Sequence, residues 1–343
     1  MKNKFIPNVD PVKRVSMQSI ADVVGVARST VSFVLNGKEK EGRISEEVAQ
    51  KVRLTAKKMN YQINGIARSL RTGSTHTIAL VIADISDVFF GTLAYHLQEY
   101  AESKGYALII INTGEKKERL QPIFNMLANR QVDGIIMVPV SNIEEGRLEG
   151  LNPNIPMVFV DRYFKTLQTS RVIINNYEVS KMAAQLLIGK GCRKIAMISY
   201  SESLMHIQDR KQGYIDALSA VNALDRQLIC EVGYFGLKSE KIMDFLKEKY
   251  TTCGIDGLFL ATGGLTSATS RCLLHLGIKL QVDVQLVGFG RIDVVTGVSI
   301  PYVKQPMEEI CKHSFDILMD QMESRTEKRI DCILPASIVT DRI

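Results

Sequence analysis

Residues 16–37 have the sequence SMQSIADVVGVARSTVSFVLNG, in which two short apolar patterns flank a glycine. In the first pattern, apolar residues at positions 20, 23 and 24 follow the i, i+3, i+4 spacing that places side chains on one face of a helix. Gly25 then permits a sharp turn that a continuing helix would forbid. The second pattern predicts a helix from Arg28 to Leu35, because Asn36-Gly37 is a pair that commonly ends helices.

The predicted second helix turns small polar residues and one arginine away from the first helix. Two short helices around a glycine turn, with such an exposed face, are typical of the helix-turn-helix motif that binds DNA. Small hydroxyl side chains allow close approach to phosphates, and arginine can pair with a guanine edge. The alternative interpretation is two ordinary helices of an unrelated bundle. A third helix is predicted over about Ser45–Met59, with Ser45 as its N-cap.

The segments that flank this motif differ from it in character. We expect a disordered lead at 1–15, a helix-turn-helix domain at 16–62 and a hinge helix or linker at 63–75. The hinge segment is too short to form a stable helix by itself. Two interpretations stay open, since it either folds on DNA and inserts Leu70 into a minor-groove base step or serves as a plain linker.

Positive charge is concentrated in the first 75 residues, which hold 14 Lys and Arg against 6 Asp and Glu, whereas the other 268 residues hold 29 against 31. This distribution is expected when one small module meets DNA phosphates. No apolar run approaches the roughly 18–20 residues of a membrane span, and no secretory signal is recognised at the start, so we expect a cytoplasmic protein without membrane contact. The six scattered cysteines form no C-x-x-C pair, and neither a metal site nor a cofactor is expected.

From Thr77 onward, apolar strand-like runs alternate with helical patterns, which predicts parallel strands joined by right-handed crossovers. The pattern restarts after Asn175-Asn176, so we expect two Rossmann-like subdomains. Their predicted bounds are about 76–175 with 305–332 for the first, and about 176–304 with 333–343 for the second. Ligands of such sheets bind beyond the carboxyl ends of the strands, in the cleft between the halves. An enzyme is disfavoured, because Gly288-Phe289-Gly290 lacks the third glycine of a dinucleotide motif, and the sequence has no G-x-x-x-x-G-K-[ST] motif, no G-x-S-x-G motif and no paired Cys/His arrangement.

Five fragments together resemble the DNA-binding headpiece of the lactose-repressor (LacI/GalR) family. They are Ser19–Val26, Ser29–Ser32, Leu35–Gly37, Asn60-Tyr61 and the run from Asn64 through Ala67-Arg68 to Leu70. The rest of the chain resembles the effector domain of the same family, which is itself similar to periplasmic sugar-binding proteins. The resemblance covers residues 16–343. It implies an N-terminal all-α helix-turn-helix headpiece, followed by an α/β periplasmic-binding-protein-like domain of two Rossmann-like subdomains.

The resemblance also implies two sets of site residues. The DNA-binding set comprises base contacts from Arg28, Ser29 and Phe33, phosphate contacts from Thr30, Ser32 and Asn36, and hinge contacts from Asn64, Ala67, Arg68 and Leu70. The effector-binding set comprises Phe89, Phe90, Asp161, Arg210 and Phe235. For each aromatic residue, the alternative is simple core packing.

Several positions depart from the family pattern. Ala27 replaces a frequent serine cap, Phe33 stands where arginine is common, and Ile63 replaces a proline before the hinge. Gly264 and Gly290 stand where the family has acidic or amide side chains that hold sugar hydroxyls. We therefore expect a less negative cleft in which no acid competes for Arg210, and this favours an anionic effector such as a sugar acid or sugar phosphate.

The sequence thus predicts a homodimeric transcription regulator, a repressor controlled by a small-molecule effector and bound to a near-palindromic operator. A dimer is favoured over a tetramer, because no leucine-heptad tail follows Thr340. The alternative is a solute-binding module without DNA function, which the basic headpiece argues against. The identity of the effector, the operator sequence and the choice between induction and corepression stay open.

Overall fold

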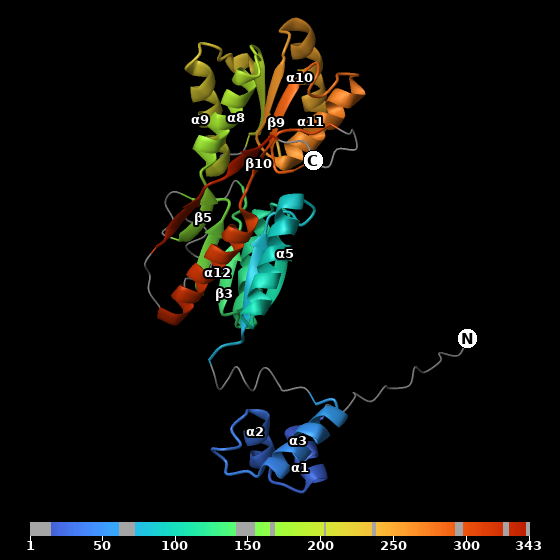
Figure 1. Cartoon of the computed structure of the whole chain (residues 1–343), viewed down its shortest axis with the longest axis vertical. Helices are drawn as coiled ribbons and strands as arrows, with labels where there is room; N and C mark the ends of the chain where they lie inside the picture. Colours follow the sequence, from blue (N-terminus) through green and yellow to red (C-terminus); the bar gives the residue numbers. More distant parts are fainter. Residues whose placement is uncertain are drawn as a thin grey trace, which may run out of the picture. The chain divides into compact units, whose positions relative to one another are not determined.

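The computed structural model describes residues 15–61, 73–141, 155–164, 169–201, 204–234, 238–291, 298–324 and 329–340. The chain divides into two compact units, Met1–Thr75 and His76–Ile343 (Figure 1). The lead expected to be disordered lies outside the described residues, and so does most of the expected hinge. No helix in the described part of the chain is long and apolar enough to cross a membrane.

The first unit contains three helices, α1 (Met17–Val24), α2 (Arg28–Leu35) and α3 (Glu46–Lys58). Ser16 caps α1, since its Oγ accepts from the Ser19 amide at 3.1 Å, and the Ser19 Oγ accepts in turn from the Ser16 amide at 3.4 Å. Gly25 ends α1 with a φ of +75°, a left-handed backbone that suits glycine. The predicted turn between α1 and α2 is therefore confirmed.

The three helices enclose a small apolar core. Its members are Ile20, Ala21, Val31, Val34, Ala49, Val52 and Ala56. Helix α2 begins without a side-chain cap at Ala27, as the sequence predicts, whereas Ser45 caps α3 through the Val48 amide at 3.4 Å. Acidic residues in the first turn of α3 and lysines in its last turn complement the helix dipole.

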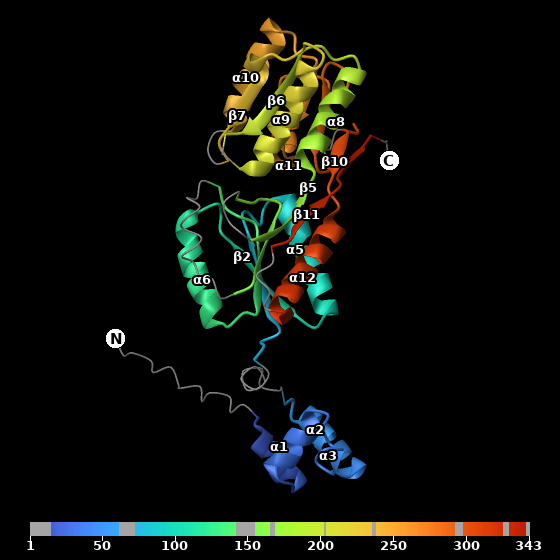
Figure 2. The same ribbon diagram turned by 90° about the vertical axis from the view of Figure 1, so that its left-hand side faces the viewer.

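The second unit consists of two lobes, each built around a six-stranded sheet (Figures 1 and 2). The first-lobe sheet has the order β11-β5-β4-β3-β1-β2, and all its strand pairs are parallel. Its strands are β1 (Thr77–Ile82), β2 (Ala107–Asn112), β3 (Gly134–Met137), β4 (Met157–Val160), β5 (Ser170–Ile174) and β11 (Asp331–Leu334). Its helices are α5 (Val88–Ser103), α6 (Leu120–Asn129), α12 (Met307–Ser324) and the short 3₁₀ helix η1 (Lys117–Arg119).

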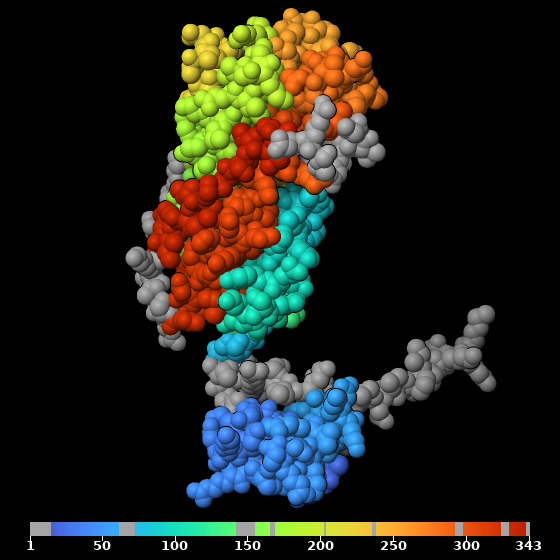
Figure 3. Space-filling model, viewed as in Figure 1, coloured from blue at the N-terminus to red at the C-terminus, as the bar shows by residue number. Residues whose placement is uncertain are grey.

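The helices of the first lobe cover both faces of its sheet. Helices α5 and α12 pack side by side on one face, where Figure 3 shows them in teal and orange-red, and α6 lies on the other face in Figure 2. The Tyr100 hydroxyl on α5 bonds to Asp316 on α12 at 3.1 Å. The chain requires this layering, because the strands β1, β3 and β4 are apolar on both faces and need cover on each.

The second-lobe sheet has the order β12-β10-β9-β8-β6-β7, and only the β10–β12 pair is antiparallel among the pairs described. Its strands are β6 (Ile195–Tyr200), β7 (Ile229–Val232), β8 (Gly257–Leu260), β9 (Gln285–Phe289), β10 (Tyr302–Lys304) and β12 (Ser337–Val339). Its helices are α8 (Asn176–Gly189), α9 (Met205–Ser219), α10 (Lys238–Thr252), α11 (Gly263–His275) and the 3₁₀ helix η2 (Arg226–Leu228).

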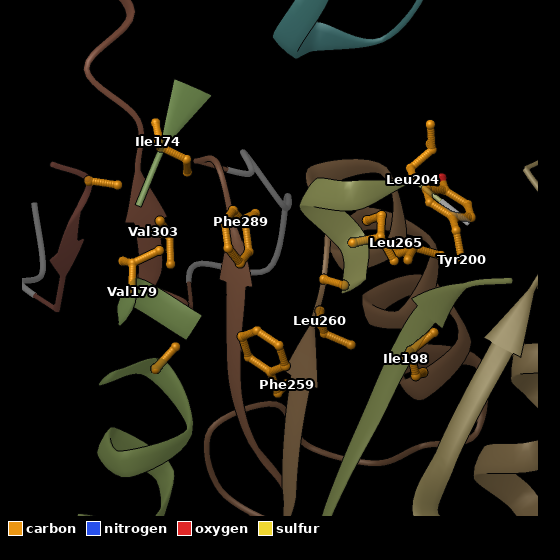
Figure 4. Packing of buried hydrophobic residues seen from close by; sticks show 14 of the residues in the cluster. Ile174, Val179, Ile198, Tyr200, Leu204, Phe259, Leu260, Leu265, Phe289 and Val303 are labelled. Carbon is orange, nitrogen blue, oxygen red and sulfur yellow. The ribbon is translucent and has the colours of Figure 1, made fainter. Parts of the chain in front are cut away.

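The core of the second lobe is built from residues on its strands and helices. In Figure 4 the rings of Phe259 on β8 and Phe289 on β9 lie between Val179 of α8 and Leu260, and their centroids are 6.2 Å apart. The last two strands of the chain belong to different lobes, β11 to the first and β12 to the second. Between them the chain passes from one lobe to the other, and there the Ala336 amide donates to Asn175 Oδ1 at 2.8 Å, which attaches this segment to the residue before α8.

Candidate functional sites

Helix α2 presents the face that the sequence assigns to DNA. Arg28 and Ser29 are exposed, and Thr30 and Ser32 are half-buried beside them. Asn36 is more tied to the helix than predicted, because its Nδ2 donates to the Ser32 carbonyl oxygen at 2.6 Å. This bond caps the end of α2, and it occupies part of the amide that we expected to meet a phosphate.

Phe33 lies at the far end of the same face and is 38% exposed. One side of its ring packs on the loop that follows α2, where a β-carbon built on Gly42 would lie 3.0 Å from Phe33 Cγ. The other predicted DNA contacts, Asn64, Ala67, Arg68 and Leu70, lie outside the described residues.

In the second unit, the carboxyl ends of the strands bring together residues from both lobes. Asp161 follows β4 directly, and its Oδ1 lies 3.8 Å from Nη2 of Arg210 on α9. Arg210 is buried, and its Nε and Nη1 donate to Asn176 Oδ1 and the Ala261 carbonyl oxygen, both at 2.8 Å. Its guanidinium also lies 3.8 Å from the ring centroid of Phe289. Nη2 has no hydrogen-bond partner among the described residues.

A second buried arginine, Arg162, lies beside this pair. Its Nη1 donates to Glu115 Oε1 in an ion pair, and Glu115 Oε2 accepts from the Ser141 amide at 2.9 Å. The guanidinium of Arg162 lies 5.5 Å from the ring centroid of Phe90 in the first lobe and 5.9 Å from that of Tyr234 in the second. Arg162 therefore contacts both lobes.

Arg162 Nε points to the same carboxylate as Arg210. It lies 3.9 Å from Asp161 Oδ2 and has no hydrogen-bond partner in the described part of the chain. Both arginine–aspartate distances are too long for a hydrogen bond. Two buried donors thus flank one carboxylate without being satisfied by it, although such donors are normally paired. We refer to Asp161, Arg162, Arg210, Glu115 and His206 as the interlobe site.

The electrostatics of the interlobe site reflect its burial. Burial raises the pKa of Asp161 against the opposing effect of Arg210 and Arg162. Burial also lowers the pKa of Arg210 to about 10, so this arginine stays charged at neutral pH. His206, at the start of α9, has its pKa held well below the ordinary value, first by burial and then by the two arginines. It is therefore neutral, and its Nδ1 is another buried atom with no partner among the described residues.

Two acidic residues of this region have a strained backbone. Glu115 has a φ of +54° and Asp161 a φ of +64°, in the left-handed region that non-glycine residues rarely adopt. Such strain costs roughly 1–3 kcal/mol per residue and clusters at functional sites. Here it turns one carboxylate inward to Arg162 and places the other between the two arginines.

The structure bears on two expectations about the interlobe site. Phe90 is only 4% exposed and belongs to the core, which agrees with the core-packing alternative, and its ring centroid lies 5.5 Å from the Arg162 guanidinium, whereas Phe89 is partly buried beside it. The expectation that no acid lies near Arg210 is wrong, because Asp161 is 3.8 Å away. Gly264 lacks a carboxylate of its own, but a β-carbon built there would lie 3.5 Å from Asp87 Oδ2 of the first lobe. Phe235 lies outside the described residues.

The arrangement offers donors and acceptors that hydroxyl groups would satisfy. A hydroxyl can accept from an arginine and donate to a carboxylate at once, so it matches both sides of the arginine–aspartate pairs, whose atoms lie 3.8–3.9 Å apart. Sequence reasoning missed Arg162, although it follows Asp161 directly after an apolar strand. It also missed Glu115 and His206, for which the sequence carries no recognisable pattern.

Matches to known proteins cover both units. Residues 16–64 match the bacterial regulatory proteins of the lacI family. Residues 75–232 match the periplasmic binding proteins and sugar binding domain of the LacI family, and residues 184–341 match a periplasmic binding protein-like domain.

Individual proteins are similar along nearly the whole chain. The HTH-type transcriptional repressor PurR of Vibrio vulnificus is 28% identical over 339 residues, which cover 96% of this chain and 98% of that protein. The ribose operon repressor of Halalkalibacterium halodurans is also 28% identical, over 94% of this chain and 95% of that protein. A solved lac repressor dimer, bound to operator and the anti-inducer ONPF, has the same fold, with a TM-score of 0.81, 18% identity and coverage of 96% and 98%. With its helix-turn-helix unit and its two-lobed second unit, the chain belongs to the lacI family of bacterial regulatory proteins.

Proposed function

We propose that this lacI-family regulator is a homodimeric transcriptional repressor that acts in the cytoplasm. It binds a near-palindromic operator through α2 and responds to a small neutral polyhydroxylated effector at the interlobe site. The observation that carries the proposal is the presence, in one chain, of an exposed polar helix face and a buried site with unsatisfied donors. No catalytic role is assigned, and the curated relatives are named repressors.

DNA recognition is assigned to the exposed face of α2. Arg28 is exposed on its first turn, where the recognition helix of such motifs meets base edges. Its guanidinium can pair bidentately with guanine, and this contact is worth about 1–3 kcal/mol of discrimination. Ser29, Thr30 and Ser32 are small enough to allow the helix to lie close to the phosphates. The hinge residues Asn64, Ala67, Arg68 and Leu70 are proposed to join these contacts when the operator is bound.

A neutral effector suits the interlobe site better than an anion. Two guanidinium groups face the region, but Glu115 neutralises one and Asp161 lies beside both. The carboxylate or phosphate of an anionic effector would be repelled by the negative charge of Asp161, because both would be buried away from solvent. Sugar hydroxyls carry no such penalty, and they can pair with Arg162 Nε, Arg210 Nη2 and the Asp161 oxygens together.

Dimerisation is assigned to the face formed by α5 and the edge strand β2. Val88 and Tyr95 lie seven residues apart on α5, on one face of the helix, and are 77% and 59% exposed. Ile110 on the neighbouring strand β2 is 39% exposed. Apolar residues gathered on adjacent elements are typical of protein interfaces. Two copies would also present two α2 helices to the two halves of a palindrome.

Two measurements test the proposal. Selection from a random duplex library should enrich a near-palindromic sequence, and Arg28→Ala should lose preference at one position of each half-site, whereas failure to enrich any sequence would exclude a specific DNA-binding function. A thermal-shift series of pentoses, hexoses, sugar acids and sugar phosphates should identify stabilising ligands among the neutral sugars. Stabilisation by the acids alone would contradict the assigned effector class.

A further inference from the structure

The loop between α2 and α3, residues 38–43, is a compact folded element and not an extended connection. We refer to it as the α2–α3 loop. Its backbone closes through four hydrogen bonds, from the Lys38 amide to the Phe33 carbonyl oxygen at 2.9 Å, from Gly42 to Lys38 at 3.0 Å, from Arg43 to Lys40 at 3.2 Å, and from Ile44 to Glu39 at 2.9 Å. The first of these bonds attaches the loop directly to the last turn of α2.

The charges of this loop are not all matched within the protein. Glu41 pairs with Lys38 at 2.9 Å, and Glu39 pairs with Arg53 of α3. Lys40 and Arg43 are exposed, and neither forms an ion pair with any described residue. Each acid of the loop is thus neutralised internally, and two cations remain available next to the DNA-facing helix.

Phe33 connects the loop to α2. A β-carbon on Gly42 would lie 3.0 Å from both Phe33 Cγ and Ile44 Cδ1, so the ring sits over a position where a side chain would have to displace it. The loop therefore packs on the Phe33 ring through the backbone of Gly42, which has no side chain. Arg43, the next residue, is held with a φ of +48°, so the backbone turns sharply just beyond this contact.

We propose that Phe33 is a positioning residue for DNA binding, whose ring holds the α2–α3 loop against the end of α2 so that Lys40 and Arg43 contact the DNA backbone. The inference rests on the proposed DNA-binding function. Phosphates are the expected partner, because neither cation forms an ion pair in the described headpiece and both belong to the loop that follows the assigned DNA-binding helix. A loop held in place before binding loses less conformational entropy on the duplex than a loose one.

The test is the salt dependence of DNA binding by the full chain, measured by anisotropy on the selected duplex and on a random duplex of equal length. Each phosphate contact contributes about 0.9 to the slope of log K against log salt. In a dimer, Arg43→Gln should therefore reduce the slope by roughly 2, and Lys40→Gln/Arg43→Gln by roughly 4. Lys247→Gln, an exposed lysine of α10, is the matched control and should leave the slope unchanged.

Variants of the contact distinguish a positioning role from direct base contact. Phe33→Ala should reduce the slope on both duplexes, Phe33→Leu should retain most of it, and Gly42→Ala should act like Phe33→Ala without altering α2. In the Lys40→Gln/Arg43→Gln background, Phe33→Ala should produce no further loss of slope. Thermal melts check that each headpiece is folded.

Three results would overturn the inference. The first is a slope unaffected by Lys40→Gln/Arg43→Gln, and the second is a slope loss from Phe33→Ala that persists in that background. The third is a Phe33→Ala variant that keeps its slope and changes only the selected consensus. If selection enriches no operator, the proposed function is refuted. The role of the α2–α3 loop can still be decided in that case, because the salt slope is also measured on random DNA.

Discussion

The buried ion pair between Glu115 and Arg162 allows the sharpest stability prediction. The side chain of Glu115 is fully buried and that of Arg162 is 5% exposed, so solvent screens neither charge. Glu115→Gln keeps the shape and one acceptor for the Ser141 amide, but it leaves Arg162 as a buried cation without its main partner. Removing one partner of a buried pair costs about 3–5 kcal/mol. For a unit of this size, that loss lowers Tm by roughly 6–20 °C.

The assay is differential scanning calorimetry of the full chain, which suits a protein without tryptophan. Glu231→Gln is the matched control, because Glu231 pairs with Lys211 at the surface of the same unit and should contribute less than about 1 kcal/mol. The double variant Glu115→Gln/Arg162→Met should recover most of the loss, since no unpaired charge remains. A Glu115→Gln variant as stable as the control, or a double variant worse than the single one, would refute the reasoning.

Two further predictions concern pH and assembly. His206 favours its neutral form in the folded state, because burial and the two arginines lower its pKa, so stability present above about pH 6.5 should be lost as the pH falls, by up to about 1.4 kcal/mol per pH unit. His206→Gln should flatten this dependence in calorimetry between pH 7 and 5. Tyr95→Lys, which places a charge on the exposed face of α5, should shift the chain from dimer to monomer in sedimentation velocity, whereas Lys247→Gln should not.

Local patterns were sufficient to predict the helix-turn-helix and the buried strands of this fold. The turn at Gly25 depends on neighbouring residues only, and buried strands such as β1 and β3 are continuous apolar runs whose character does not depend on their partners. Short, partly exposed strands such as β7 and β12 carry no such run and were not predicted. The interlobe site depends on long-range pairing instead. Arg162 meets Glu115 across 47 residues of sequence, and no local pattern indicates that a loop after β2 will lie beside the end of β4.

The aromatic pair illustrates the same limit. Phe89 and Phe90 follow a strand, where ligands of such sheets bind, but helix α5 already begins at Val88. The helix turns Phe90 into the core, and only the structure shows that its ring supports an arginine. An aromatic residue at the start of a helix can pack in the core or contact a ligand, and its sequence position does not decide between the two.

Asp87 of the first lobe places a carboxylate next to Gly264, which has no side chain of its own. The β-carbon position of Gly264 lies 3.5 Å from Asp87 Oδ2, so the first lobe places a carboxylate where a second-lobe side chain would otherwise project. Asp87 also caps α5, because its Oδ1 accepts from the Phe89 amide at 2.9 Å. Burial raises the pKa of Asp87, which indicates that its charge is already poorly solvated. A second carboxylate there would meet strong repulsion.

Gly264→Asp should therefore destabilise the second unit at pH 7, by on the order of 3 kcal/mol for two charges about 5 Å apart at an effective dielectric constant of 20. The loss should shrink as the pH falls toward 4.5, because protonation of either carboxyl removes the repulsion. Asp87→Ser in the same background keeps an N-cap for α5 and should restore stability at pH 7. Gly264→Asn, with nearly the same volume and no charge, separates repulsion from crowding. If it were as harmful as Gly264→Asp at every pH, steric exclusion and not charge would account for the glycine.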